Sequence, residues 1–185
     1  MAIVFPNGAQ QGAVLQTRQC VFNGISAPSV SSDNWTNFGI EANLTPISSN
    51  SYIRFTWCIP FASPNSLNST VRIARRIGGS GTFGETSSNL QSSWDVTRPR
   101  GQHMSVFFHG GNWSYNSNLI MQGIDNPGTT STVWYRPELM TNNSGSFYIG
   151  FNNSTGGTGN GYSRAPTIII LEELDPDNVS SLDAI

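Results

Sequence analysis

The sequence predicts an all-β fold, an antiparallel β-sandwich of jelly-roll type. Apolar and polar residues alternate in several separate segments, and clusters of Gly, Asn, Ser and Pro stand between those segments. No window keeps a helical period over about ten residues. Roughly seven to nine strands joined by such turns fit a sandwich or a jelly roll. The 185 residues are expected to form one domain, without internal repeat or linker.

The clearest strand period runs through residues 52–61. Alternate residues there are apolar and are expected to face the core: Ile53, Phe55, Trp57, Ile59 and Phe61. Pro60 has no amide hydrogen to donate, so this strand is expected to end at Pro60 or to lie at the edge of a sheet.

Later segments repeat the alternation. Four further sets of core-facing residues are expected: Val71, Ile73 and Ile77; Met104, Val106 and Phe108; Val133, Tyr135 and Leu139; Phe147, Ile149 and Phe151. The run from Thr167 to Leu174 is apolar on both faces, which predicts a central strand.

The two ends of the chain differ from its middle. Residues 1–12 are predicted to form an N-terminal arm, residues 13–174 the jelly-roll domain, and residues 175–185 an acidic C-terminal tail. Such a tail is usually solvated, but it could also dock on a neighbouring subunit. The first residues carry no cationic segment and no long apolar run, so neither a signal peptide nor a membrane helix is expected.

Charge is scarce and unusual in kind. Only 11% of the residues are charged and the net charge is -2, which argues against nucleic acid as a partner, because phosphate binding needs a clustered cationic face. All nine cations are Arg, with one local cluster at Arg72, Arg75 and Arg76. Arg is enriched at protein interfaces, although a lineage bias would give the same composition.

Residues that could carry catalysis are few. His103 and His109 are six residues apart on one strand, about 20 Å, and cannot chelate one ion within a chain, although one His on a threefold axis could do so with its symmetry copies. No GxSxG elbow occurs, and the acidic residues are scattered over expected loops and strand ends: Glu41, Glu85, Asp95, Asp125 and Glu138. We therefore expect no enzymatic activity, no catalytic or metal site and no cofactor.

The two cysteines, Cys20 and Cys58, lie in separate expected strands. They could form a disulfide if those strands are neighbours, which the sequence does not show. Reduced thiols are the favoured state.

Aromatic residues in polar loops are the better lead to a function. Asn112, Trp113 and Tyr115 lie in the segment GGNWSYNSN, which offers both aromatic faces and amide groups and is a candidate surface for recognising glycans. Trp35, Phe83 and Tyr162 are similar loop aromatics. The favoured alternative is that these side chains cap the ends of the sandwich or pack against a neighbouring subunit.

Four segments carry a resemblance to a known family: MAIVFPNGAQ, IDNPGTTSTVWY, SGSFYIGF and RAPTIIILEEL, in this order. Together they resemble small virion proteins of marine tailed phages, notably cyanophages. The matching positions are Asp125, Pro127, Thr129, Thr130, Ser131 and Tyr135 in the middle segment, Gly145, Phe147, Tyr148 and Ile149 in the hairpin, and Thr167 to Glu172 in the last strand. Residues 23–100 match only in general character.

The resemblance implies a jelly-roll virion component of the tumour-necrosis-factor type, a homotrimer that belongs to a tail fibre or another part of the particle and is assembled in the host cytoplasm. Contacts with other capsid or tail proteins are expected, and contact with a host surface glycan is left open by the Trp-rich loops. The chain has no long fibre shaft, so it is expected to be a tip module, an adaptor or a capsid decoration protein. A free carbohydrate-binding module is the alternative from another class.

Overall fold

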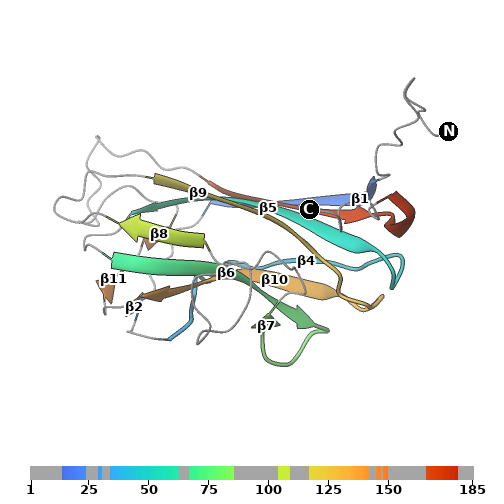
Figure 1. The fold of residues 1–185 in the computed structure, drawn as a ribbon, viewed down its shortest axis with the longest axis horizontal. Coiled ribbons are helices and arrows are strands. Elements are labelled where there is room, and N and C mark those ends of the chain that lie inside the picture. The colour runs from blue at the N-terminus through green and yellow to red at the C-terminus, as the bar shows by residue number, and fades with distance from the viewer. Residues whose placement is uncertain are drawn as a thin grey trace, which may run out of the picture.

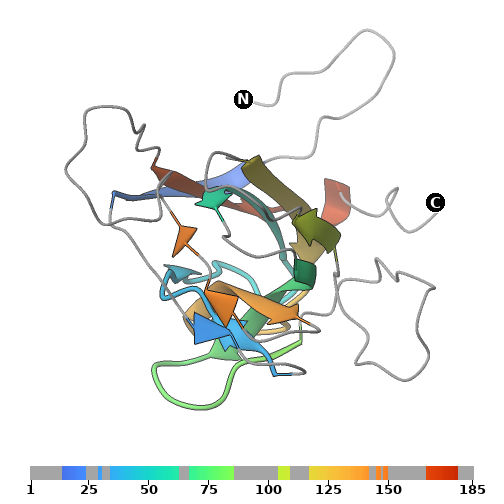
Figure 2. The ribbon, with the colours of Figure 1, turned by 90° about the vertical axis from the view of Figure 1, so that its left-hand side faces the viewer.

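The computed structural model of the protein describes residues 14–23, 29–30, 34–62, 67–85, 104–108, 117–141, 145–146, 148–149 and 166–178. These residues form two antiparallel sheets stacked as a sandwich (Figure 1). In the view along the strands, the sheets form opposite walls around a shared core (Figure 2).

Each sheet is built from strands that are distant in the sequence. The first sheet has the order β1 (Val14–Phe22), β13 (Thr167–Leu174), β5 (Tyr52–Ala62) and β9 (Ser117–Asp125), and the short β12 (Tyr148–Ile149) also pairs with β5. In the second sheet β10 (Val133–Thr141) and β6 (Leu67–Ile77) form the centre. Around them lie β3 (Thr36–Asn37), β4 (Ala42–Leu44), β7 (Gly84–Glu85) and β8 (Met104–Phe108). A separate pair joins β2 (Ser29–Val30) to β11 (Gly145–Ser146).

The strand order identifies a jelly roll. When the principal strands β1, β4, β5, β6, β8, β9, β10 and β13 are numbered one to eight along the chain, the first sheet has the order 1-8-3-6 and the second 2-7-4-5. Every connection except that from β6 to β8 therefore passes from one sheet to the other. Such interleaving of two Greek keys defines the jelly-roll sandwich. The predicted fold class is confirmed.

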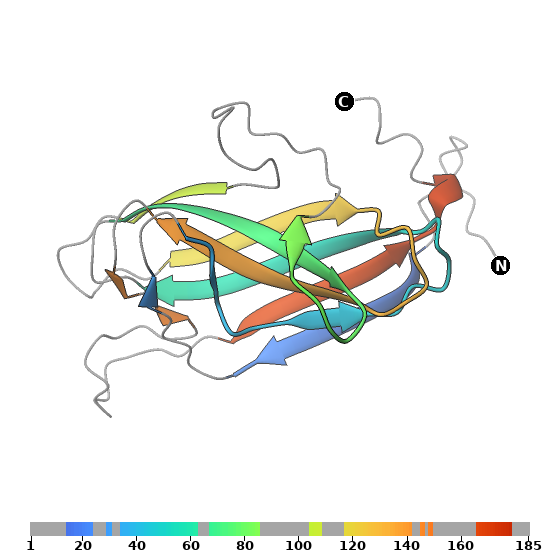
Figure 3. The same ribbon diagram turned by 90° about the horizontal axis from the view of Figure 1, so that it is seen from below.

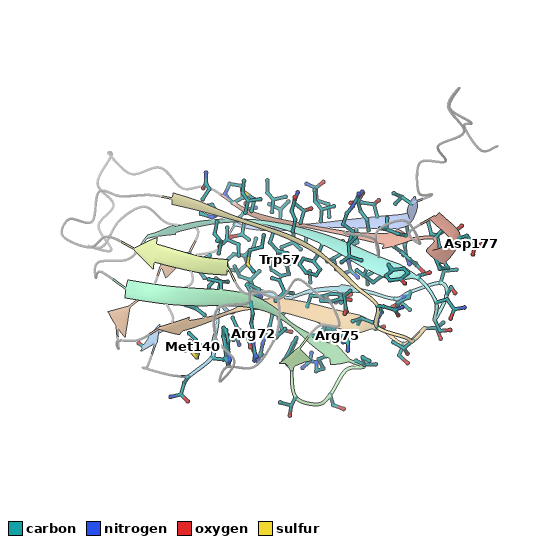
Figure 4. All side chains as sticks on the ribbon, viewed as in Figure 1. Trp57, Arg72, Arg75, Met140 and Asp177 are labelled. Atoms are coloured by element: carbon teal, nitrogen blue, oxygen red, sulfur yellow. The ribbon has the colours of Figure 1, made fainter. Side chains whose placement is uncertain are left out.

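Alternate residues of both sheets fill the core. Trp57, at the centre of β5, lies between the two sheets (Figure 4) and is fully buried. Phe55 of the same strand meets Tyr135 of β10 with ring centroids 6.0 Å apart. Fully burying one such apolar side chain stabilises the fold by about 1.5–3 kcal/mol relative to leaving it exposed. The core-facing residues predicted for β10 are confirmed, as are those predicted for β5 from Ile53 to Ile59.

The prediction for Pro60 is wrong. Strand β5 continues to Ala62 and lies inside its sheet, with β13 on one side and β9 on the other. Pro60 is opposite Asn118 of β9, but on the other side it falls between Cys58, the last residue paired with β13, and Phe61, the first paired with β12. An interior strand accepts a proline here because the pairing changes partner at this position.

Two burial predictions need correction. Ile77 is 44% exposed, since it is the last residue of β6 and Gly78, with a φ of 79°, turns the chain away. Strand β13 is central in its sheet, as predicted, but only one of its faces is fully buried: Thr167, Ile169, Leu171 and Glu173 are buried, and Ile168, Ile170 and Glu172 are half-buried. The outer face of the first sheet is therefore not a second core.

Several predictions concern residues outside the described part of the chain, among them the arm at 1–12 and Phe151. The predicted tail begins with a single 3-10 turn, η1 (Pro176–Asn178), where the Asp177 amide donates to Asp175 Oδ1 at 3.1 Å. Asp177 marks that end of the sandwich in Figure 4. Strand β8 forms where the alternation predicted it. Within the described ranges, no helix has the length and apolarity needed to cross a membrane.

Candidate interaction surfaces

The outer face of the second sheet carries an ionic cluster centred on Glu138 of β10. Arg72 of β6 binds one oxygen, with its Nε 2.8 Å and its Nη2 2.7 Å from Oε2. Arg136 binds the other, with its Nε 2.9 Å and its Nη2 2.7 Å from Oε1. The Glu138 side chain is only 4% exposed. A buried carboxylate whose two oxygens each accept paired charge-assisted hydrogen bonds from an arginine is fixed in one orientation, so Glu138 contributes to the packing of this face.

Aromatic rings stack on the same arginines. Trp35 lies 4.1 Å from the Arg72 guanidinium, and Phe83 lies between Arg136 at 3.8 Å and Arg76 at 4.6 Å. These distances fit cation–π contacts, each worth about 0.5–1 kcal/mol or more when water is excluded. We call Glu138, the three arginines and the two rings the arginine–aromatic layer. Two of the loop aromatics singled out in the sequence, Trp35 and Phe83, thus pack on arginines of the second sheet within the chain. This differs from the favoured alternative, which placed them at the ends of the sandwich or against a neighbouring subunit.

A second polar cluster joins the two sheets at one end of the sandwich. Arg75 of β6 donates from Nη1 to both oxygens of Asp125 on β9, at 2.9 and 3.0 Å, and the Tyr135 hydroxyl donates to Asp125 Oδ2 at 2.8 Å. Asp125 and Tyr135 are fully buried. Burial and the neighbouring Asp125 carboxylate raise the pKa of Tyr135 well above its ordinary value, so the hydroxyl keeps its proton and acts as a donor.

Glu173 of β13 holds a loop at the same end. Its Oε1 accepts the backbone amides of Ile47 at 2.8 Å and Ser48 at 3.1 Å, and its Oε2 accepts the Gln16 side chain of β1. The side chain is fully buried. Burial alone would raise the pKa of Glu173, but these hydrogen bonds outweigh it, and the pKa lies below its ordinary value.

Three of the five carboxylates that the sequence placed in scattered positions, Glu41, Asp125 and Glu138, are bound by arginine, while the side chains of Glu85 and Asp95 lie outside the described part of the structure. Glu138 lies in the middle of β10, and Glu41 lies 3.6 Å from Arg76 and 3.7 Å from Arg136. The sequence could not show this, because only the register of β6 against β10 puts Arg72 beside Glu138. Within the described residues, no group of three or more His, Cys, Asp or Glu side chains could hold a metal ion.

The two cysteines are free. Strand β13 lies between their strands, since Ile169 is paired with Cys20 on one side and with Trp57, the neighbour of Cys58, on the other. Two strand spacings of about 4.8 Å exceed the Cα separation of about 7 Å that a disulfide can span. The thiols also point to opposite faces, because Cys20 packs against the core and Cys58 shares the outer face with Ile168.

The outer face of the first sheet has no comparable layer among the described residues. Ile120 of β9 is 57% exposed and Val21 of β1 is 51% exposed. The side chains of Ile168 and Cys58 between them are half-buried. This uncovered face, which points away from the second sheet in Figures 1 and 4, is the candidate interaction surface.

The remaining predicted site residues, Asn112, Trp113 and Tyr115, lie outside the described residues, as do Tyr162, His103 and His109. The recognition loop therefore remains a prediction from the sequence.

No protein-family model matches the chain, and no curated protein matches it. Two solved structures are similar over 91% of the chain. One is the structure of the infectious bursal disease virus Gx strain, with 13% identity and a TM-score of 0.40; the other is the VP2 subviral particle of infectious bursal disease virus, with 12% identity and a TM-score of 0.36. The chain spans 43% and 44% of the length of these two proteins. The jelly-roll assignment rests on the strand order of this chain itself.

Proposed function

We propose that this protein is a non-enzymatic structural subunit of a virus particle, one that assembles through a sheet face and its terminal arms. The jelly roll is a common architecture of viral capsid proteins, but lectin domains and cupins share it, so the fold alone does not select the function. The resemblance of four sequence segments to virion proteins of marine tailed phages favours the first of these classes.

The contrast between the two outer faces of the sandwich carries the proposal. The second sheet is covered by its own side chains, with Glu138 and Arg72 bound to each other and Trp35 stacked above. The first sheet leaves Ile120 and Val21 more than half exposed. An exposed row of apolar side chains across a sheet, in a subunit with so few charges, favours an assembly contact at this face.

Several finer features belong to the same proposal. The particle is that of a tailed phage, the subunit is displayed on its surface as a fibre or appendage component, and other capsid or tail proteins anchor it. A capsid decoration protein is the nearest variant, with the segment 1–12 as the part that grips the shell. The homotrimer that the resemblance implies stays a prediction, and the mass measurements described below distinguish it from a twofold dimer.

The direct experiment is to purify particles from the infected host on a density gradient and to quantify this chain by mass spectrometry. We expect the chain to band with the particles at a fixed ratio to the major capsid protein. Recovery of the chain only from the soluble fraction would contradict the structural role. Deleting residues 1–12 should remove the chain from particles, while circular dichroism shows an unchanged fold.

A carbohydrate-binding module is the candidate from another class, and the composition of the GGNWSYNSN loop favours it. In that case the isolated protein binds a host glycan, and Trp113→Ala removes the binding, whereas Trp35→Ala leaves it because Trp35 stacks on Arg72. Glycan binding that survives Trp113→Ala would contradict this assignment of the site.

A further inference from the structure

We propose that the uncovered outer face of the first sheet binds the same face of a second copy, around a twofold axis that runs parallel to the strands between β13 and β5. This inference deepens the proposed structural role and rests on it for its biological meaning. The two copies would meet through identical faces, and the arrangement of residues on that face supports such a contact.

The outward residues of the four strands form three rows across the sheet. The register gives them in the order β1, β13, β5, β9: first Val21, Ile168, Cys58 and Ile120; then Gln19, Ile170, Thr56 and Gln122; then Thr17, Glu172, Arg54 and Ile124. Every one of these side chains is half-buried or exposed, whereas the intervening residues of β13 and β5 are buried. The first row is apolar from one edge of the sheet to the other.

A rotation by 180° about an axis between β13 and β5 produces a second copy in which the order of residues in each row is reversed. Each row of one copy then faces the same row of the other copy. Such an arrangement is isologous, with each contact made twice. In the first row, Val21 then faces Ile120 of the second copy, and Ile168 faces Cys58. In the second row, Gln19 faces Gln122, and two side-chain amides can bond each other because each has donors and an acceptor.

The third row supplies the specificity. Its two central residues are Glu172 and Arg54, which form an ion pair within the chain at 2.7 Å. Reversal of the row places Glu172 opposite Arg54 of the copy, and Arg54 opposite its Glu172. The Arg54 side chain is 47% exposed, so it has donors left for a second carboxylate. Within these rows the face carries no other charge, and its neutrality means that two copies approach each other without repulsion.

The size of the face suits a reversible contact. Four strands about 4.8 Å apart, with about eight residues of 3.3 Å each, outline a plane of roughly 500 Å². A standard interface takes about 800 Å² of accessible surface from each partner, so this face is large enough for a small interface between two copies. Packed sheets lie about 10 Å apart with their strands nearly aligned, which a twofold axis parallel to the strands permits.

A charge-swap experiment tests the symmetry. Arg54→Glu leaves two acidic residues at the centre of the third row, and Glu172→Arg leaves two basic ones. Each variant alone should sediment at the 20.0 kDa protomer mass, with dimerisation weakened at least tenfold relative to the wild type. An equimolar mixture of the two should return to twice that mass, because each Glu then faces an Arg of the other chain. The double variant should also self-associate.

A second pair of variants tests the apolar row and controls for misfolding. Ile120→Glu should abolish the dimer, since Ile120 lies in the first row and is 57% exposed. Ile77→Glu is the matched control, because Ile77 is 44% exposed but belongs to the second sheet. Both variants should keep the wild-type circular dichroism spectrum, and only Ile120→Glu should change the mass.

Three results would overturn the proposal. The first is a wild-type protein that keeps the protomer mass at every concentration up to its solubility limit. The others are a trimer mass that none of the variants changes, and a charge-swap mixture that stays dissociated. The virion experiment is independent of these. A monomer that is still recovered in particles would refute the twofold contact and leave the structural role intact. A dimer that is absent from particles would support the twofold contact and contradict the structural role.

Discussion

Arg75 and Asp125 join the two sheets of the sandwich through one doubly bonded ion pair. The Arg75 Nη1 lies 2.9 and 3.0 Å from the two Asp125 oxygens, and the residues come from β6 of the second sheet and β9 of the first. Figure 3 shows the strands of the two sheets crossing at an angle. The pair fixes one sheet relative to the other where the apolar core ends.

Replacement of Arg75 by Leu should be strongly destabilising, because it leaves the fully buried Asp125 carboxylate without its cation. Breaking a buried ion pair by removing one partner typically costs about 3–5 kcal/mol. Urea unfolding measures this loss. Arg18→Leu is the control, since Arg18 is exposed and its side chain donates to Asn43 at the surface, and its cost should be about 1 kcal/mol or less. Equal losses in the two variants would contradict the role of the pair.

Glu138→Leu should destabilise the arginine–aromatic layer by about 3–5 kcal/mol, because the mostly buried Arg72 and Arg136 then lose their shared counter-ion. Replacing Arg72 and Arg136 by Met in the same chain should recover most of that loss, since apolar residues of similar volume are tolerated at such sites. Thermal unfolding of the three proteins checks it. If the triple variant is no more stable than Glu138→Leu, the layer does not work as described.

The stability of the protein should fall in acid partly through Glu173. The folded-state pKa of this carboxyl is depressed below its ordinary value of 4.5. A depressed pKa means that the ionised form stabilises the fold above the unfolded-state pKa, and that this stability is lost as the pH falls through the folded-state pKa. Glu173→Gln should therefore cost about 1–3 kcal/mol at pH 7, and its stability should decline less steeply than that of the wild type as the pH falls below the ordinary carboxyl pKa of 4.5. If the unfolding free energy of the variant falls with decreasing pH as steeply as that of the wild type, Glu173 does not contribute to the acid sensitivity.

Trp57→Phe should be nearly neutral, within about 1 kcal/mol, although Trp57 is fully buried at the centre of β5. Its Nε1 finds no hydrogen-bond partner among the described residues, so the smaller ring removes an unsatisfied donor as well as some contact area. Trp57→Ala should cost about 3–5 kcal/mol by opening a cavity. Chemical unfolding compares the two. A loss for Phe as large as that for Ala would show that the indole nitrogen has a partner.

Periodicity was enough to predict the fold class and most of the core-facing residues of β5, β6 and β10. Ile53, Phe55 and Trp57 alternate with polar residues, and that alternation survives in any antiparallel sandwich. Pro60 misled the prediction because the tolerance of a strand for proline depends on where its partners begin and end, and this is a property of the pairing.

The candidate surfaces were harder to predict, because they depend on register across strands that are distant in the chain. Arg72 and Glu138 are 66 residues apart, and Val21 and Ile120 belong to one row only because β13 and β5 lie between them. The composition did carry one signal, since a chain with nine Arg and no Lys suggested that its cations make packed contacts. Arg72, Arg75 and Arg136 do make such contacts within the chain, while the role of arginine at an interface stays a prediction.

The reactivity of Cys58 in intact particles tests the central claim most directly. Cys58 lies on the uncovered face of the first sheet, in the row with Ile168 and Ile120, while Cys20 packs against the core. In particles that carry Cys20→Ala subunits, a small maleimide should label Cys58 slowly, and the same subunits should react at least tenfold faster once dissociated and diluted to monomers. Equal labelling rates in particles and in monomers would contradict assembly through this face.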